Sequence, residues 1–150
     1  MNNKLRSSFV YVTYIRTTPS KLWSALTDPE FVKQYWFNMR IECDWKVGST
    51  YELKYPDGRL DSSGEILEFD PPRRLVYKWL HERPELKAEG HTRCTMDLEP
   101  VGSAVKLSIT HEIELVDSKF IGLASGSWPK VLSNLKSLLE TGEVVLLDYK

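Results

Sequence analysis

Two hydrophobic periods divide most of the chain. Between residues 39 and 113, apolar and polar residues alternate with a period of two, as in Leu75, Tyr77 and Trp79, or in the residues 105–113. Between residues 117 and 142 the period changes to 3.6, which is typical of an amphipathic helix. Alternation with a period of two predicts strands that bury one side and expose the other, and therefore an antiparallel sheet.

The segment before residue 39 predicts one strand and two short helices. Residues 9–16 are rich in β-branched and aromatic side chains, which favour strands. Thr18 and Asp28 can each cap a helix that begins with a proline, at Pro19 and Pro29. The predicted order is one strand, two short helices, six strands and one long helix. This order indicates an α+β fold, in which a curved antiparallel sheet wraps around a long C-terminal helix.

The end of the chain raises two further points. Pro129 lies inside the helical pattern, so it either begins the main helix or kinks a longer one, and Gly142 is a typical residue just past a helix end. The following segment, 143–150, contains the apolar run Val144-Val145-Leu146-Leu147. Such a run predicts that the segment folds back onto its own domain or packs against a second copy of the chain as a homodimer.

Composition narrows the range of partners. The 150 residues include 20 basic and 21 acidic side chains, and a net charge of −1 does not favour nucleic acid or an anionic membrane surface. The longest aliphatic run is far too short to span a membrane. Cys43 and Cys94 lie far apart and form no metal-binding motif, which favours a reducing, cytoplasmic location. We expect one domain over residues 1–150, because no linker or repeat interrupts the pattern.

Four segments resemble a known family. TTPSKLWSALTDPEFVKQYW, GEILEFDPPRRLVYKW, AVKLSITHE and GSWPKVLSNLKSLLETG occur in this order within residues 9–142. They resemble the START-like, or SRPBCC, superfamily, and within it the branch related to the activator of the ninety-kilodalton heat-shock ATPase. The resemblance implies the helix-grip fold. It does not specify a function, because the superfamily includes lipid carriers, cyclases and co-chaperones.

The gap expected between the sheet and the long helix is a natural place for an apolar ligand. We therefore expect a binding module for a small hydrophobic molecule, lipid-like or polyketide-like. The alternatives are a co-chaperone-like domain that acts on a heat-shock ATPase, and an enzyme of the cyclase or hydrolase kind, which the residues support least.

Candidate ligand-binding residues occupy the inward positions of the strands and the apolar stripe of the helices: Trp36, Tyr51, Tyr77, Trp79, Met96, His111, Phe120, Ala124 and Trp128. Ordinary core packing is the alternative for the aromatic residues. His111 is either a hydrogen-bonded core residue or a polar group that orients a ligand.

No catalytic motif is present, and the sequence suggests neither a cofactor nor a metal. His81 lies near a strand end, where it can simply be exposed. Glu68 lies between apolar neighbours, and whether it faces the cavity depends on the phase of its strand.

Overall fold

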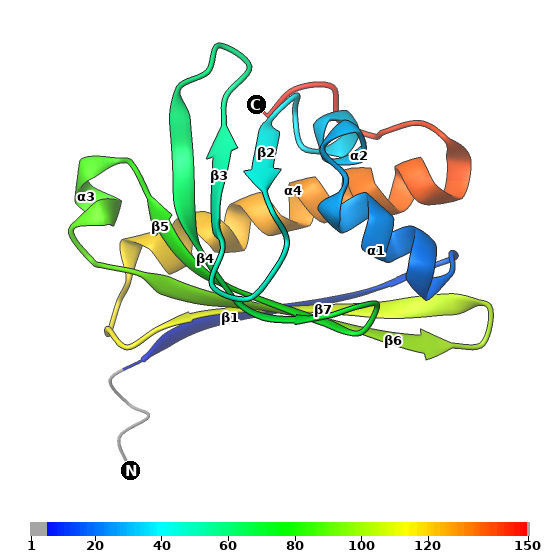
Figure 1. The fold of residues 1–150 in the computed structure, drawn as a ribbon, viewed down its shortest axis with the longest axis horizontal. Helices are drawn as coiled ribbons and strands as arrows, with labels where there is room; N and C mark the ends of the chain where they lie inside the picture. Colours follow the sequence, from blue (N-terminus) through cyan, green and yellow to red (C-terminus); the bar gives the residue numbers. More distant parts are fainter. Residues whose placement is uncertain (1–5, 150) are drawn as a thin grey trace.

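The computed structural model describes residues 6–149 (Figure 1); residues 1–5 of the predicted domain and Lys150 of the predicted C-terminal segment lie outside it. The described residues form one antiparallel sheet and four helices. The strands are β1 (Ser7–Ile15), β2 (Arg40–Cys43), β3 (Thr50–Lys54), β4 (Leu60–Asp70), β5 (Arg74–His81), β6 (Thr92–Val101) and β7 (Ala104–Ile113). The helices are α1 (Pro19–Thr27), α2 (Pro29–Tyr35), α3 (Pro84–Lys87) and α4 (Lys119–Thr141).

The seven strands follow the order β1-β7-β6-β5-β4-β3-β2. Strands β2 to β7 form a meander, and β1 joins its end by pairing with β7, where Phe9 lies opposite His111. The sheet bends strongly, and α4 lies inside the bend (Figure 1). The predicted α+β helix-grip architecture is confirmed.

Local signals in the sequence explain where α1 and α2 begin. The Thr18 hydroxyl accepts a hydrogen bond from the Lys21 amide at 3.2 Å, and the Asp28 carboxylate accepts one from the Glu30 amide at 3.0 Å. Each helix has proline as its first residue, where the missing N–H costs no intrahelical hydrogen bond. Both predicted short helices are therefore present.

Helix α4 is continuous through Pro129. The helix begins at a cap formed by Ser118, whose hydroxyl accepts a hydrogen bond from the Ile121 amide at 3.1 Å. It ends at Gly142, which adopts a left-handed φ of 88° and donates its N–H to the Leu138 carbonyl. Of the two roles considered for Pro129, the structure shows a proline within a longer helix. No helix among residues 6–149 has both the length and the hydropathy that a membrane crossing requires.

The sequence did not predict α3. This single turn between β5 and β6 is too short to show a helical period, although Pro84 occupies its first position as in α1 and α2.

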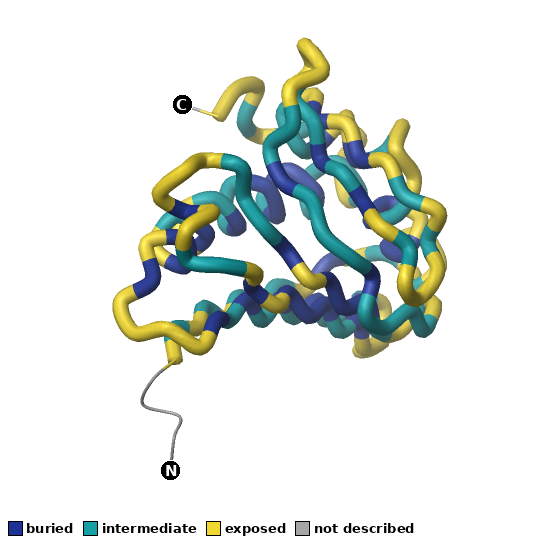
Figure 2. The backbone as a smooth tube through the Cα atoms, turned by 60° about the vertical axis from the view of Figure 1, so that its left-hand side comes forward, coloured by how far each residue is buried: buried dark blue, intermediate teal, exposed yellow. Residues whose placement is uncertain are grey.

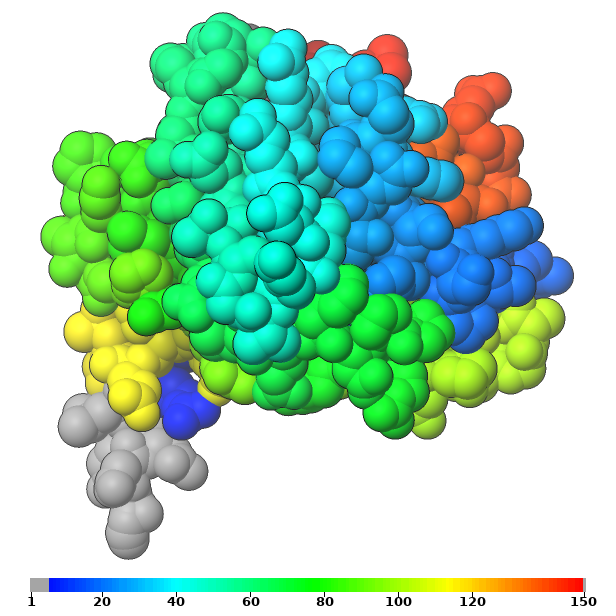
Figure 3. Space-filling view, in the orientation of Figure 1, coloured from blue at the N-terminus to red at the C-terminus, as the bar shows by residue number. Residues whose placement is uncertain are grey.

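The core lies between α4 and the inner face of the bent sheet. Buried residues follow α4 and alternate along the strands, whereas the exposed ones gather in the loops (Figure 2). In β7 the alternation is complete, and the five residues expected inside, including His111, are all buried. Viewed as in Figure 3, α1, α2 and the strands β2–β4 form a continuous surface in front of α4.

The segment after α4 folds back onto its own domain. The buried side chain of Asn134 accepts hydrogen bonds from the Val145 and Leu146 amides and donates one to the Leu146 carbonyl. Val144 and Leu146 are half-buried, but Val145 and Leu147 are exposed. Lys130 Nζ also donates to the Tyr149 carbonyl at 3.0 Å, and the Tyr149 ring meets Phe37 edge to face at 5.5 Å. The predicted fold-back is therefore correct, although it shelters only half of the apolar run.

Gly64 shows why β4 requires a glycine at its centre. A Cβ atom built on Gly64 would lie 1.6 Å from the backbone oxygen of Lys78 and 3.1 Å from the Tyr51 ring. By contrast, a Cβ atom built on Gly122, on the exposed side of α4, would have no neighbouring atom within 4 Å.

We predict that Gly64→Ala lowers the free energy of unfolding by at least about 3 kcal/mol, because the methyl group collides with backbone rather than with a flexible side chain. Gly122→Ala is the matched control, and we expect it to raise stability by about 0.5–1 kcal/mol through helix propensity. Urea denaturation of both variants checks this. A Gly64→Ala protein as stable as the wild type would contradict the close approach of β4 and β5.

Candidate ligand cavity

A cavity of about 510 Å³ lies between α4 and the sheet. Its walls come from the α2–β2 turn, β3, β4, β5, β7, α4 and the C-terminal segment. The lining residues are Trp36, Phe37, Asn38, Met39, Leu53, Tyr55, Pro56, Asp61, Ser62, Trp79, His81, Arg83, His111, Phe120, Leu123, Ala124, Ser127, Trp128, Val131, Leu147, Asp148 and Tyr149. The volume is in the range of cavities that hold small organic molecules.

Three tryptophans from separate elements form the apolar wall. The Trp36 ring stacks on Trp79 at a centroid distance of 6.2 Å and meets Trp128 edge to face at 5.3 Å. Trp79 and Trp128 are also edge to face, at 5.9 Å. These contacts join the α2–β2 turn, β5 and α4, so the aromatic wall also holds the elements around the cavity together.

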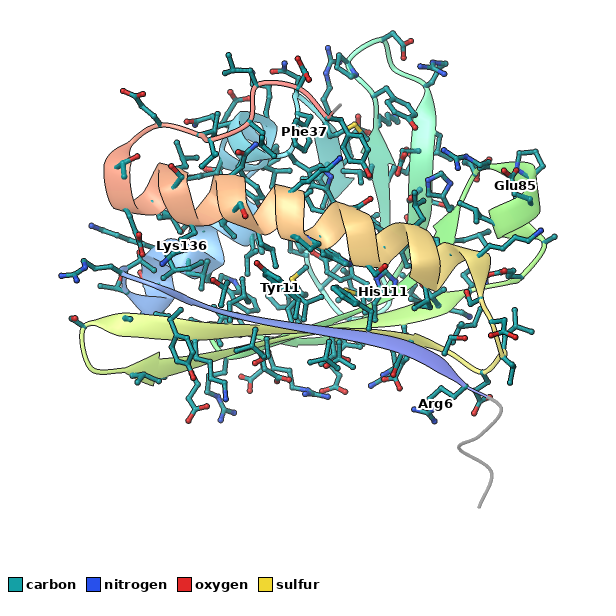
Figure 4. The ribbon with its side chains drawn as sticks, turned by 180° about the vertical axis from the view of Figure 1, so that it is seen from behind. Arg6, Tyr11, Phe37, Glu85, His111 and Lys136 are labelled. Atoms are coloured by element: carbon teal, nitrogen blue, oxygen red, sulfur yellow. The ribbon has the colours of Figure 1, made fainter. Side chains whose placement is uncertain are left out.

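His111 connects this wall to the sheet through hydrogen bonds. Its Nδ1 accepts a bond from the Trp128 indole N–H at 3.1 Å, and its Nε2 lies 2.8 Å from the Thr92 hydroxyl. Because the indole can only donate, the proton of the neutral imidazole must be on Nε2 and is donated to Thr92. The Thr92 hydroxyl in turn donates to the Trp79 carbonyl at 3.2 Å. In Figure 4, His111 lies directly beside α4.

This environment keeps His111 uncharged. Burial lowers the pKa of the imidazole to about 3, because the protonated ring would lose its hydration without gaining an anionic partner. Both ring nitrogens are already bonded to protein atoms, so His111 lines the cavity with its ring. Of the two roles predicted for it, the structure favours the hydrogen-bonded core residue.

Six of the nine predicted site residues line the cavity: Trp36, Trp79, His111, Phe120, Ala124 and Trp128. Tyr51, Tyr77 and Met96 do not, although all three are buried on the same inner face. The two tyrosine rings pack edge to face against Trp79, at 5.7 and 5.6 Å, and fill the space behind it. Strand phase identifies inward side chains but does not separate cavity wall from solid core.

The hydrophobic pattern of the sequence does not reveal the polar end of the cavity. Asp61, Ser62, Tyr55 and Arg83 line it, together with His81, whose side chain is only 11% exposed. The expectation that His81 is exposed is therefore wrong, because β4 and the segment after β5 cover it. The position of His81, two residues after Trp79 and four after Tyr77 in the same strand, was a signal that it faces inward. No periodicity in the sequence indicated that Asp61 faces inward.

Glu68 lies on the outer face of the sheet, away from the cavity. Its carboxylate bonds Arg74 Nε at 2.9 Å and Arg93 at 3.1 Å. The hydrogen bond from Arg74 lowers the pKa of Glu68, which is opposed by a smaller desolvation effect. Glu68 is therefore a carboxylate in a structural ion pair on the sheet surface and not a cavity residue. Within residues 6–149, no group of three His, Cys, Asp or Glu side chains is arranged to hold a metal ion.

The fold and the cavity define a helix-grip α+β domain. Residues 16–140 match the family model described as "Activator of Hsp90 ATPase homolog 1-like protein", and the chain belongs to this family. No curated protein sequence matches the chain.

Solved structures share the fold. The Aha1 dimer from Colwellia psychrerythraea is 24% identical, with a TM-score of 0.76 over 91% of this chain and 98% of that one. PFC0360w, an HSP90 activator from Plasmodium falciparum, is 22% identical, with a TM-score of 0.73 over 88% and 95% of the two chains. DynU16, from the dynemicin biosynthetic locus, is 18% identical, with a TM-score of 0.77 over 95% and 49%. At such identities the likeness shows the fold alone.

We predict that neutral His111 makes the protein less stable as the pH falls below 6.5. The folded-state pKa lies below the unfolded one, so the unfolded chain takes up a proton that the folded chain refuses, and stability is lost progressively between about pH 6.5 and pH 3. At pH 5 this effect amounts to roughly 2 kcal/mol. His111→Gln, whose amide can accept from Trp128 and donate to Thr92, should lose about that much less between pH 7.5 and 5.

Urea unfolding at the two pH values measures the difference, and His91→Gln is the control because His91 is exposed. An equal loss in wild type and His111→Gln would show that the His111 imidazole does not resist protonation.

Proposed function

We propose that the chain binds a small hydrophobic molecule, lipid-like or polyketide-like, in the cavity between α4 and the sheet. The observation that carries the proposal is the 510 Å³ cavity with its wall of three tryptophans. Removing apolar surface from water contributes about 25 cal/mol per Å² before the costs of association. Trp36, Trp79, Phe120, Ala124 and Trp128 would supply most of this surface.

We also propose that binding, and not efficient catalysis, is the main activity. The two histidines at the cavity are both engaged: His111 bonds Trp128 and Thr92, and His81 bonds the Arg83 amide and lies 3.4 Å from Asp61. Neither imidazole offers a free nitrogen for general base chemistry in this arrangement. A hydrolase or cyclase activity would need one of these bonds to break.

We predict that filling the cavity abolishes binding. Ala124 is buried on α4 and lines the cavity, so Ala124→Phe places a ring in the ligand's space. Its neighbour Ser125 is exposed, and Ser125→Phe is the matched control on the same helix. With a neutral apolar dye, N-phenylnaphthylamine, we expect Ala124→Phe to weaken binding on the order of tenfold or more and Ser125→Phe to leave it unchanged.

Dye fluorescence and tryptophan quenching both report the binding. If the wild type binds no dye, or if Ala124→Phe binds as well as wild type while circular dichroism shows it folded, the proposed function is wrong.

A co-chaperone-like role is the second candidate, because the family is described by a chaperone activator and PFC0360w carries the same description. The outer face of β1 offers an apolar surface, where Val10, Val12 and Tyr14 are about half exposed. We expect the purified chain not to stimulate ATP hydrolysis by an Hsp90-type ATPase, since no partner-contact motif is recognisable in the sequence. A rate increase that Val12→Lys removes would support the co-chaperone role instead.

A single domain, a cytoplasmic location and homodimer formation stay predictions. The free state of Cys43 and Cys94 supports the location, and the dimer of the Colwellia psychrerythraea protein supports a test of oligomeric state by light scattering.

A further inference from the structure

The polar end of the cavity is built around a β-bulge that directs one carboxylate inward. In the pairing of β3 with β4, Leu53 lies opposite Ser62 and Lys54 lies opposite Leu60, so Asp61 is the extra residue of the bulge. A bulge interrupts the alternation of faces and can redirect a side chain. Asp61 and the next residue, Ser62, both line the cavity as a result.

The carboxylate of Asp61 is held by Ser62 and His81. The Ser62 hydroxyl donates to Oδ2 at 2.7 Å, and Oδ1 lies 3.4 Å from His81 Nε2. His81 Nδ1 accepts the Arg83 amide N–H at 3.0 Å, so the single proton of a neutral imidazole is on Nε2 and points toward Asp61. Tyr55 lines the same end of the cavity, and burial, followed by a hydrogen bond to Asp61, raises the pKa of its hydroxyl.

Among the described residues no lysine or arginine pairs with the Asp61 carboxylate, and His81 is the basic side chain beside it. Burial raises the pKa of Asp61, but the hydrogen bonds from His81 and Ser62, followed by the electrostatic attraction of His81 and a hydrogen bond from Tyr55, outweigh it and leave the pKa below its ordinary value, so the group is ionised at neutral pH. The other charged residues of the cavity lining are Arg83, whose guanidinium is 4.0 Å from the Glu85 carboxylate, and the exposed Asp148. The cavity lining as a whole therefore holds two carboxylates against one guanidinium, beside an apolar wall that strengthens electrostatic attraction.

We propose that the cavity selects amphipathic ligands that carry a protonated amine, which binds the carboxylate of Asp61 while the apolar or aromatic part of the ligand rests on Trp36, Trp79 and Trp128. This inference rests on the proposed function and adds the chemical class of the ligand. An ammonium group donates three hydrogen bonds and carries a positive charge opposite to that of the Asp61 carboxylate. An alcohol offers one hydrogen-bond donor without a charge, and a ligand carboxylate is repelled by Asp61.

Three ligands with the same ring test the charge preference: naphthylmethylamine, naphthylmethanol and naphthoate, titrated by calorimetry at pH 7. We expect the ammonium compound to bind the wild type on the order of tenfold more tightly than the alcohol, and the carboxylate to bind most weakly. Asp61→Asn should bind the amine and the alcohol about equally. Asp57→Asn removes the same charge in the exposed β3–β4 turn, outside the cavity lining, and should keep the preference.

The outcomes separate the two proposals. If none of the three compounds binds the wild type, the proposed function fails and the ligand class fails with it. If the alcohol binds but the amine binds no better, or if Asp61→Asn keeps the preference, the cavity binds ligands without the selection proposed here. Should Asp61→Asn fail to fold, the ranking of the three compounds on the wild type still decides whether the cavity prefers a cation.

Discussion

One long helix, with the two short helices α1 and α2 beside it, has to cover the inner face of a seven-stranded sheet, and the rest of the structure depends on this mismatch. Strands lie about 4.8 Å apart, so seven of them laid flat would span about 30 Å. An α-helix with its side chains is only about 10–12 Å wide. The sheet bends around α4 and reduces the difference, with β1 and β7 packed against the helix. The space that remains between α4, the α2–β2 turn and β3–β5 is the cavity.

Polar contacts hold the helix at this position. The bond from the Trp128 indole to His111 joins α4 to β7, and the bond from His111 to Thr92 extends the connection to β6. A further contact uses Asn134, which donates to the Tyr35 carbonyl in α2 at 3.3 Å and binds the C-terminal segment with its remaining capacity. Buried polar groups are costly when unpaired, so a helix rotated away from these partners would lose more than apolar contact area.

The same satisfaction of polar atoms limits the chemistry of the site. Because His111 and His81 both use their two nitrogens within the protein, the cavity offers few free donors or acceptors. Asp61 is the exception, since a carboxylate has more acceptor positions than its neighbours fill and also carries a charge. The fold is shared with both a chaperone activator and a protein of a biosynthetic locus, so the fold alone does not determine the function. Local features such as Asp61 have to distinguish between the candidate functions.

The sequence by itself determined the elements, their order and their inner faces. Caps at Thr18 and Asp28, the alternation in β5–β7 and the stripe on α4 are local signals, because helix ends and side-chain periods depend on neighbours a few residues away. The motifs that resemble the heat-shock ATPase activators then indicated the arrangement of these elements. Only the tertiary structure decided which inward residues line the cavity. Tyr51 and Tyr77 have the same phase as Trp79, yet they lie behind it in solid core. The tertiary structure alone also showed that Asp61 faces inward. Its orientation follows from a bulge, and a bulge depends on the register of two paired strands, which the periodicity of one strand does not encode.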